Sequence, residues 1–89
     1  MVIQVRVRSG RRADFEAWLR DYNAAVGQAA GHLDYDLTRP TPGFDEDWVL
    51  VHRFADKGSA ARWAGSDAHR ELLDDAAVLA VGEIDIHLY

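Results

Sequence analysis

One segment, residues 47–54 (DWVLVHRF), constrains the fold more than any other part of this 89-residue chain. It alternates as a β-strand does, but both of its faces carry large apolar side chains. One face holds Val49 and Val51, and the other holds Trp48, Leu50 and Phe54. A strand that is apolar on both faces is typical of a central position in a sheet that is covered on both sides. A chain of this length forms one domain, residues 1–89, so this strand should lie at its centre.

Periodicity along the rest of the chain predicts the other elements. Alternation predicts strands at 2–8, 32–39 and 82–89. Helical spacing of apolar residues predicts helices at 11–28, near 57–64 and near 67–80. Pro and Gly residues predict a loop at 40–46. The order is β-α-β-β-α-α-β. This order predicts the α+β class with a ferredoxin-like arrangement, in which helices cover one face of an antiparallel four-stranded sheet.

The alternation also divides each strand into an inner and an outer face. The predicted inner face comprises Ile3, Val5, Val7, Leu33, Tyr35, Leu37, Leu50, Phe54, Ile84, Ile86 and Leu88. If the hairpin turns around residues 43 and 44, Leu37 pairs with Leu50, Tyr35 with His52, and Leu33 with Phe54. His32 and His87 fall on the polar faces, and the acidic run at 45–47 is expected at the surface.

Composition limits the possible partners. The chain has no cysteine and a formal net charge of −5, and 48% of its residues are hydrophobic. These features disfavour disulfides, thiolate metal sites and nucleic-acid binding. No apolar run approaches the ~20 residues of a membrane helix, so we expect a cytoplasmic protein. A small apolar-rich domain gains burial by self-association. We therefore expect a homodimer through the outer sheet face, covering Val49 and Val51 and pairing its charges across the interface.

Two histidines are candidates for proton transfer. His69 lies near the centre of the apolar stripe of the helix at 67–80, and Ser66 is a plausible N-cap. Burial and the helix N-terminus both disfavour an imidazolium there, so a neutral ring could act as a general base. His52 shares the inner face of its strand with Leu50. The alternative for both is a structural histidine that fills the core and bonds to a carbonyl or to Tyr35.

Three aromatic residues complete the candidate site. Tyr22, Tyr35 and Trp63 point toward the same layer as the two histidines, so together they predict a small-molecule pocket between sheet and helices. Aromatic side chains at these spacings also occur simply as core. We find no third ligand that would make His87 and Asp85 a metal site.

The segments GHLDYDLTRP, WVLVHRF, RWAGSDAHRELL and FEAWLRDYNAAVGQAAGHL resemble the antibiotic biosynthesis monooxygenase family, part of the dimeric α+β barrel superfamily. Trp63 matches a tryptophan that the family's oxygenases carry. The asparagine and the iron-ligating histidine of the heme-degrading members would fall at Ile3 and Leu73, so the resemblance does not imply heme cleavage. In the members that oxidise anthrone-like aromatics, an asparagine and a tyrosine would fall at Ser59 and His69.

The resemblance implies a cofactor-independent monooxygenase that acts on an aromatic, polyketide-like small molecule. His69 or His52 would remove a proton, Trp63 would stack on the substrate, and Tyr22 or Tyr35 would position a substrate oxygen. Neither a metal nor another cofactor is implied. Two alternatives remain: a polyketide cyclase that closes rings by an intramolecular aldol reaction, and a non-enzymatic dimeric ligand-binding module.

Overall fold

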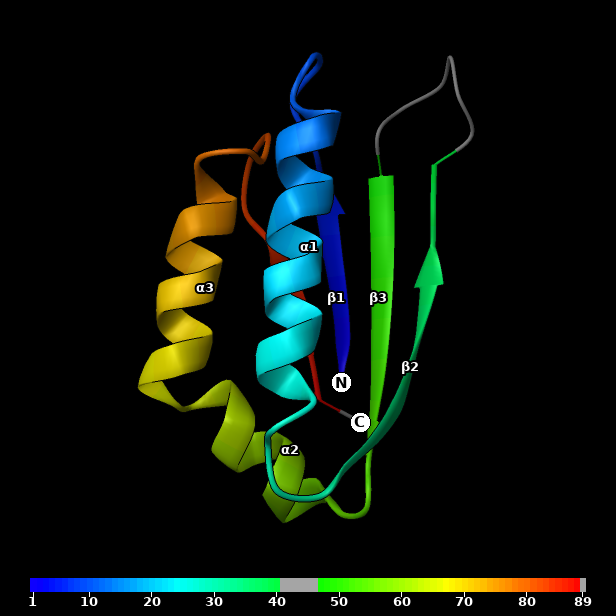
Figure 1. Ribbon diagram of the computed structural model, residues 1–89, viewed down its shortest axis with the longest axis vertical. Helices are drawn as coiled ribbons and strands as arrows, with labels where there is room; N and C mark the ends of the chain where they lie inside the picture. Colours follow the sequence, from blue (N-terminus) through cyan, green and yellow to red (C-terminus); the bar gives the residue numbers. More distant parts are fainter. Residues whose placement is uncertain (41–46, 89) are drawn as a thin grey trace.

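The computed structural model describes residues 1–40 and 47–88 (Figure 1). The elements in chain order are β1 (Val2–Arg6), α1 (Arg12–Val26), β2 (His32–Thr38), β3 (Asp47–Phe54), α2 (Lys57–Ala64), α3 (Asp67–Ala77) and β4 (Asp85–His87). This is the predicted order. Most of the predicted loop at 40–46, and residues 45 and 46 of the acidic run, lie outside the described residues.

The four strands form one antiparallel sheet in the order β2-β3-β1-β4. β3 is therefore an inner strand, as its two apolar faces predict. The three helices cover one face of this sheet (Figure 1). Trp48, Leu50 and His52 of β3 are fully buried against that helical layer. The ferredoxin-like arrangement predicted from the element order is confirmed.

The predicted stripe of α1 forms the centre of the core. Its five buried residues are Phe15, Trp18, Leu19, Tyr22 and Val26, which are the five that helical spacing predicts. The helix ends at Val26, and Gly27 caps it. Trp18 joins α1 to α3, because its Nε1 donates a hydrogen bond of 2.7 Å to the carbonyl of Leu72. Burial of these large rings anchors the helical layer on the sheet.

The β2–β3 pairing confirms part of the predicted register and corrects the rest. Tyr35 pairs with His52 and Leu37 with Leu50, as expected. The register then shifts at an irregularity between His32 and Asp34, so that His32 rather than Leu33 faces Phe54. An extra residue in one strand turns its neighbours to the opposite face. The predictions that Leu33 is a core residue and that His32 lies on the polar face are therefore wrong.

The last helix and the last strand are both shorter than predicted. α3 ends at Ala77 and not at residue 80, and β4 covers only Asp85–His87. Leu88 is 50% exposed, so its predicted place on the inner face is also wrong. Beyond β1, Val7 forms an isolated bridge with Ala80, which holds the segment after α3 against the sheet.

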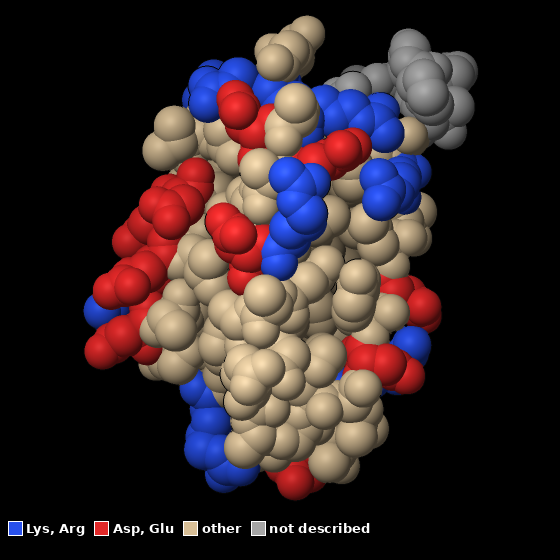
Figure 2. All heavy atoms as spheres, in the orientation of Figure 1, with Lys and Arg blue, Asp and Glu red and all other residues tan. Residues whose placement is uncertain are grey.

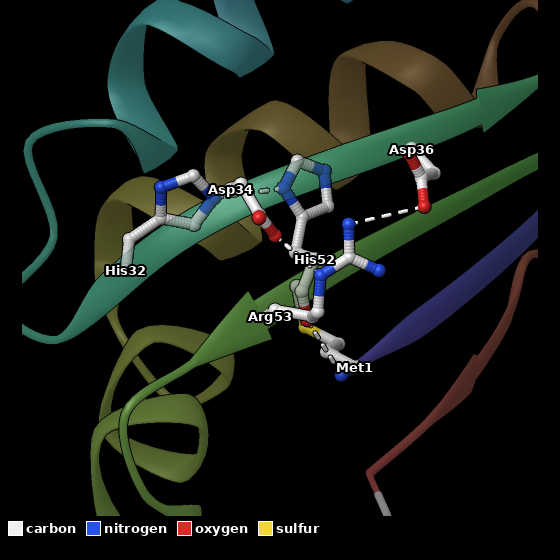
Figure 3. A network of polar contacts seen from close by, with 6 residues as sticks. All are labelled: Met1, His32, Asp34, Asp36, His52 and Arg53. Carbon is white, nitrogen blue, oxygen red and sulfur yellow. Dashed lines mark hydrogen bonds and ion pairs between the residues drawn. The ribbon is translucent and has the colours of Figure 1, made fainter.

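Several charged residues on the outer face of the sheet form ion pairs within the chain. Arg53 of β3 forms ion pairs with Asp34 and Asp36 of β2 (Figure 3). Arg6 of β1 binds Asp47 of β3 through two hydrogen bonds of 2.9 and 3.1 Å. We expected such charges to pair across a dimer interface, but within one chain they already have partners. Val49 and Val51 lie between these pairs and are only half-buried.

Charge on the helical side is mixed (Figure 2). Acidic side chains follow the solvent side of α3, and basic side chains gather near the start of α1. The acidic residues of α3 are Asp67, Glu71, Asp74 and Asp75, all exposed. This view shows no continuous basic surface of the kind that phosphate backbones require. Within the described part of the chain, no helix has the length and apolar character needed to cross a bilayer.

Candidate functional site

Tyr22 is the centre of the candidate site. Its ring centroid lies 5.4 Å from that of His52, 5.8 Å from that of His69 and 6.0 Å from that of Trp63. Trp63 Nε1 donates a hydrogen bond of 3.0 Å to the Tyr22 hydroxyl. Burial raises the pKa of that hydroxyl, and the bond from Trp63 opposes the rise. The phenol therefore stays protonated at neutral pH and can donate its hydrogen to another group.

His69 is held in a single orientation by the start of α3. The Ser66 hydroxyl accepts a hydrogen bond of 3.2 Å from the His69 backbone N–H, which confirms the predicted N-cap. The His69 Nδ1 lies 3.2 Å from the carbonyl oxygen of Ala64. A carbonyl only accepts, so Nδ1 carries the hydrogen and Nε2 of the neutral ring carries a lone pair.

The other side of the His69 ring faces the interior. The side chain is 1% exposed, and its Nε2 is buried without a hydrogen-bond partner among the described residues. Burial lowers the pKa of His69, although the bond to Ala64 acts in the opposite direction. A neutral, oriented imidazole with a free lone pair has the properties of a general base.

His52 lies on the sheet side of the same layer. It is fully buried, and its Nε2 likewise has no partner within the described structure. Desolvation, followed by the nearby His32, the N-terminal amine and His69, lowers the pKa of His52 to about 4. Tyr35 stacks on this ring with a centroid separation of 5.4 Å, although Tyr35 itself is 44% exposed at the edge strand.

His32 belongs to this cluster, and sequence reasoning missed it. Its Nε2 lies 3.1 Å from Nδ1 of His52 (Figure 3). Alternation places His32 and His52 on opposite faces, and only the irregularity in β2 brings them together. The one local signal is Gly31, a residue type common where a strand departs from regular geometry.

The structure thus brings the predicted site residues into one layer, and two of them, His52 and Tyr35, line two different hollows. His52 lines a hollow of about 410 Å³ together with Met1, Phe54 and Ala60. Tyr35 lines a separate hollow of about 250 Å³ between α1 and β2. Trp63 and His69 line neither of these hollows, and they pack against Tyr22 instead. Tyr22, Trp63 and the two histidines are therefore in close contact in the free chain.

The arrangement suits proton transfer better than metal binding. Among the described residues, no group of three His, Cys, Asp or Glu side chains is placed to hold a metal ion. Two neutral imidazoles instead present unpartnered Nε2 atoms next to a phenol and an indole. Buried polar atoms are rarely left without a partner, and each exception needs an explanation, such as a catalytic role or a bound water.

Comparison with known proteins identifies relatives. The family model for antibiotic biosynthesis monooxygenase matches residues 1–75. No curated protein matches the chain.

Solved structures share the fold at low sequence identity. A conserved protein from Methanosarcina mazei Go1 is 18% identical with a TM-score of 0.84, over 99% of this chain and 86% of that one. SnoaB, a cofactor-independent oxygenase from Streptomyces nogalater, is 19% identical with a TM-score of 0.79, over 94% of this chain and 84% of that one. Rv0793 from Mycobacterium tuberculosis is 18% identical with a TM-score of 0.78, over 94% of this chain and 84% of that one.

Proposed function

Because the chain belongs to the antibiotic biosynthesis monooxygenase family, we propose that it is a cofactor-independent monooxygenase of an aromatic, polyketide-like small molecule. The observation that carries the proposal is that the Nε2 atoms on the buried rings of His52 and His69 have no hydrogen-bond partner among the residues that the structure describes. His69 Nε2 is a proton acceptor, because Nδ1 of that ring donates to the Ala64 carbonyl, and His52 Nε2 is one when Nδ1 of its ring carries the hydrogen. Structural similarity to SnoaB, described as a cofactor-independent oxygenase, supports the same reaction class.

The proposed reaction begins with removal of a proton from an activated CH2 group of the substrate by a buried imidazole. The resulting carbanion gives electrons to O2, and a C–O bond forms to yield a peroxide anion. This anion takes up one proton. Loss of water, which includes the second hydrogen of the CH2 group, then leaves a carbonyl. One oxygen atom enters the product and the other leaves as water, so the substrate supplies all the electrons.

The neighbouring aromatic residues have distinct roles in this proposal. Trp63 stacks on the flat rings of the substrate, while the Tyr22 or Tyr35 hydroxyl hydrogen-bonds a substrate oxygen. Tyr22 can do so because it accepts from Trp63 and retains its own proton for donation. A hydrogen bond to this oxygen would stabilise the negative charge that proton removal creates. Since these side chains touch in the free chain, substrate binding must separate Trp63 from the rings around it.

We propose further that the active form is a homodimer that pairs the outer sheet faces. Val51 pairs with Val2 in the β1–β3 register, and Val49 pairs with Gln4. The three valines are only half-buried. They form an apolar strip along the two inner strands of the sheet, and a second copy would cover it. The ion pairs of Arg53 and Arg6 border this strip within each chain.

Oxygen uptake with 1,8-dihydroxyanthrone as the probe tests the function. We expect one O2 consumed for each quinone formed, without H2O2, at a rate well above spontaneous oxidation. The His69→Ala and His52→Ala variants should lose most of this rate. The matched control is Glu71→Ala, because Glu71 is an exposed side chain on α3, on the opposite side of the sheet from the proposed dimer face. This control should keep the parent rate.

The alternative functions give different results in the same assay. A cyclase would consume no oxygen but would convert a linear poly-ketone into a ring. A ligand-binding module would bind the anthrone without turnover. Either result, with correctly folded protein, would contradict the monooxygenase proposal.

A further inference from the structure

His32 contacts the Nδ1 side of the His52 ring. The Nε2 atom of His52, which has no partner among the described residues, lies on the other side of that ring. The His32 Nε2 and His52 Nδ1 atoms are 3.1 Å apart, and the ring centroids are 5.3 Å apart. His52 is fully buried, whereas His32 is half-buried at the start of edge strand β2. The two rings thus form a chain of nitrogen atoms that begins in the interior and ends close to solvent.

The backbone holds His32 in this place. Gly31 has a φ of +85°, a conformation that other residues seldom adopt. A Cβ atom at Gly31 would collide with the side chain of Ser59 in α2. The carbonyl of Gly31 also accepts a hydrogen bond of 2.7 Å from the Ala55 N–H. These contacts and the irregularity in β2 turn His32 inward against Phe54.

We propose that His32 is a positioning residue that relays protons between His52 and solvent. This inference rests on the proposed function, with His52 as the buried base. In the resting pair, His52 Nδ1–H donates to His32 Nε2, which leaves the lone pair on His52 Nε2. The same hydrogen bond therefore orients the His52 ring and connects it to the exterior.

The relay moves one proton to solvent without leaving a charge on either histidine, while the negative charge stays on the substrate. A substrate proton binds His52 Nε2, the Nδ1 proton of His52 passes to His32 Nε2, and His32 Nδ1 releases a proton to water. The pair ends with His52 protonated on Nε2 and His32 donating from Nε2. One proton enters and one leaves, and both rings are neutral. The reverse sequence returns a proton to the peroxide anion.

A relay is needed because the surroundings of His52 disfavour an imidazolium. The ring is packed against Tyr22 of α1, Tyr35 of β2 and His32, with His69 of α3 close enough to act electrostatically. The N-terminal amine donates to the His52 carbonyl at 2.9 Å and adds positive charge. Among the described residues, no hydrogen bond from the His52 side chain reaches a carboxylate that could stabilise a cation.

The first experiment needs no substrate. Long-range ¹H–¹⁵N spectra of the ¹⁵N-labelled full chain report which ring nitrogen of each histidine carries hydrogen. We expect His52 to carry it on Nδ1 between pH 6 and 9, with a scalar coupling to Nε2 of His32. The His32→Gln variant should keep this tautomer, because its amide oxygen can accept from Nδ1. A parent spectrum in which His52 carries its hydrogen on Nε2 would overturn the proposal, because that nitrogen could not accept a proton.

The second experiment separates a relay from simple positioning. His32→Gln keeps a hydrogen-bond acceptor but cannot pass the proton on, so kcat for anthrone oxidation should fall by ~10²-fold with little change in KM. In His32→Ala, added imidazole should restore turnover, and 4-methylimidazole, a stronger base, should restore more. The control Glu71→Gln, on the exposed side of α3, should match the parent. Full turnover in both His32 variants would contradict the relay but leave the proposed oxygenase function intact.

The two experiments fail independently. If the parent oxidises no anthrone, the proposed function fails, and the tautomer of His52 still decides whether the pair is arranged as a relay. If the parent turns over and imidazole rescue is independent of base strength, His32 is only structural.

Discussion

The Nε1 of Trp63 donates a hydrogen bond of 3.0 Å to the hydroxyl of Tyr22, across 41 residues of sequence and between two different helices. Both side chains are buried, with exposures of 7% and 0%. The bond therefore satisfies an indole N–H that has little access to water. It also fixes the two rings that face His69.

Removing this acceptor should destabilise the fold. In Tyr22→Phe, the buried N–H of Trp63 loses its partner, and we expect the free energy of unfolding to fall by about 1–3 kcal/mol. Urea denaturation followed by tryptophan fluorescence measures the loss. Tyr35→Phe is the matched control, since Tyr35 is 44% exposed, and it should change stability by less than about 0.5 kcal/mol. Equal stability of the two variants would contradict the importance of the Trp63–Tyr22 bond.

Replacing the buried histidines should affect turnover more than stability. We expect His69→Ala or His52→Ala to lower anthrone turnover per folded molecule by ~10²–10⁴-fold, the usual contribution of a general base. Some stability is also lost, because each change removes a buried ring and His69→Ala also removes the bond to Ala64, so turnover is compared per folded molecule. Melting and turnover must be measured on the same preparations. If both variants melt well below the parent while the folded fraction retains full turnover, the two histidines are core residues only.

Stability should decrease as the solution becomes acidic. The pKa of His52 falls from 6.5 to about 4 on folding, so between these values the unfolded chain binds a proton that the folded chain does not. Stability is therefore retained above pH 6.5 and lost as the pH falls toward 4, by up to about 3 kcal/mol at about 1.4 kcal/mol per pKa unit. The lowered pKa of His69 acts in the same direction.

Urea denaturation at pH values from 4 to 8 tests this dependence. The variant His52→Phe should lose stability less steeply on acidification, because it lacks one group that takes up a proton on unfolding. An unchanged slope in His52→Phe would mean that His52 titrates normally in the folded chain.

A charge placed in the valine strip should weaken the proposed dimer. Sedimentation of the parent should give about 20 kDa, twice the 10.0 kDa of one chain. Val51→Asp should shift the protein toward the monomer, because a dimer would bury an unpaired carboxylate. Val78→Asp is a matched control at a valine that is 65% exposed on the helical side. A parent that remains monomeric at all concentrations would contradict the proposed interface.

Local periodicity alone determined the element order, the central place of β3, the buried stripe of α1 and the Ser66 cap of α3. Each of these depends on neighbours within one strand or one helical turn, where side-chain direction repeats at a fixed interval. The same regularity brought Tyr22, His52, Trp63 and His69 into one layer, because helices and strands of known facing direction must pack their apolar sides together.

Only the tertiary structure decided the position of His32. One extra residue in β2 reverses the facing of His32 and Leu33. The preceding Gly31 lies so close to Ser59, 28 residues away, that a Cβ atom would not fit there. Likewise, the tertiary structure decided that Arg53 forms ion pairs with Asp34 and Asp36 of the neighbouring strand. Alternation predicts that these residues share a face of the sheet, but it does not predict which of them form pairs. A period-two pattern does not show where a strand departs from its period. The sequence therefore predicted His52 as a candidate site residue, and only the fold showed that His32 lies beside it.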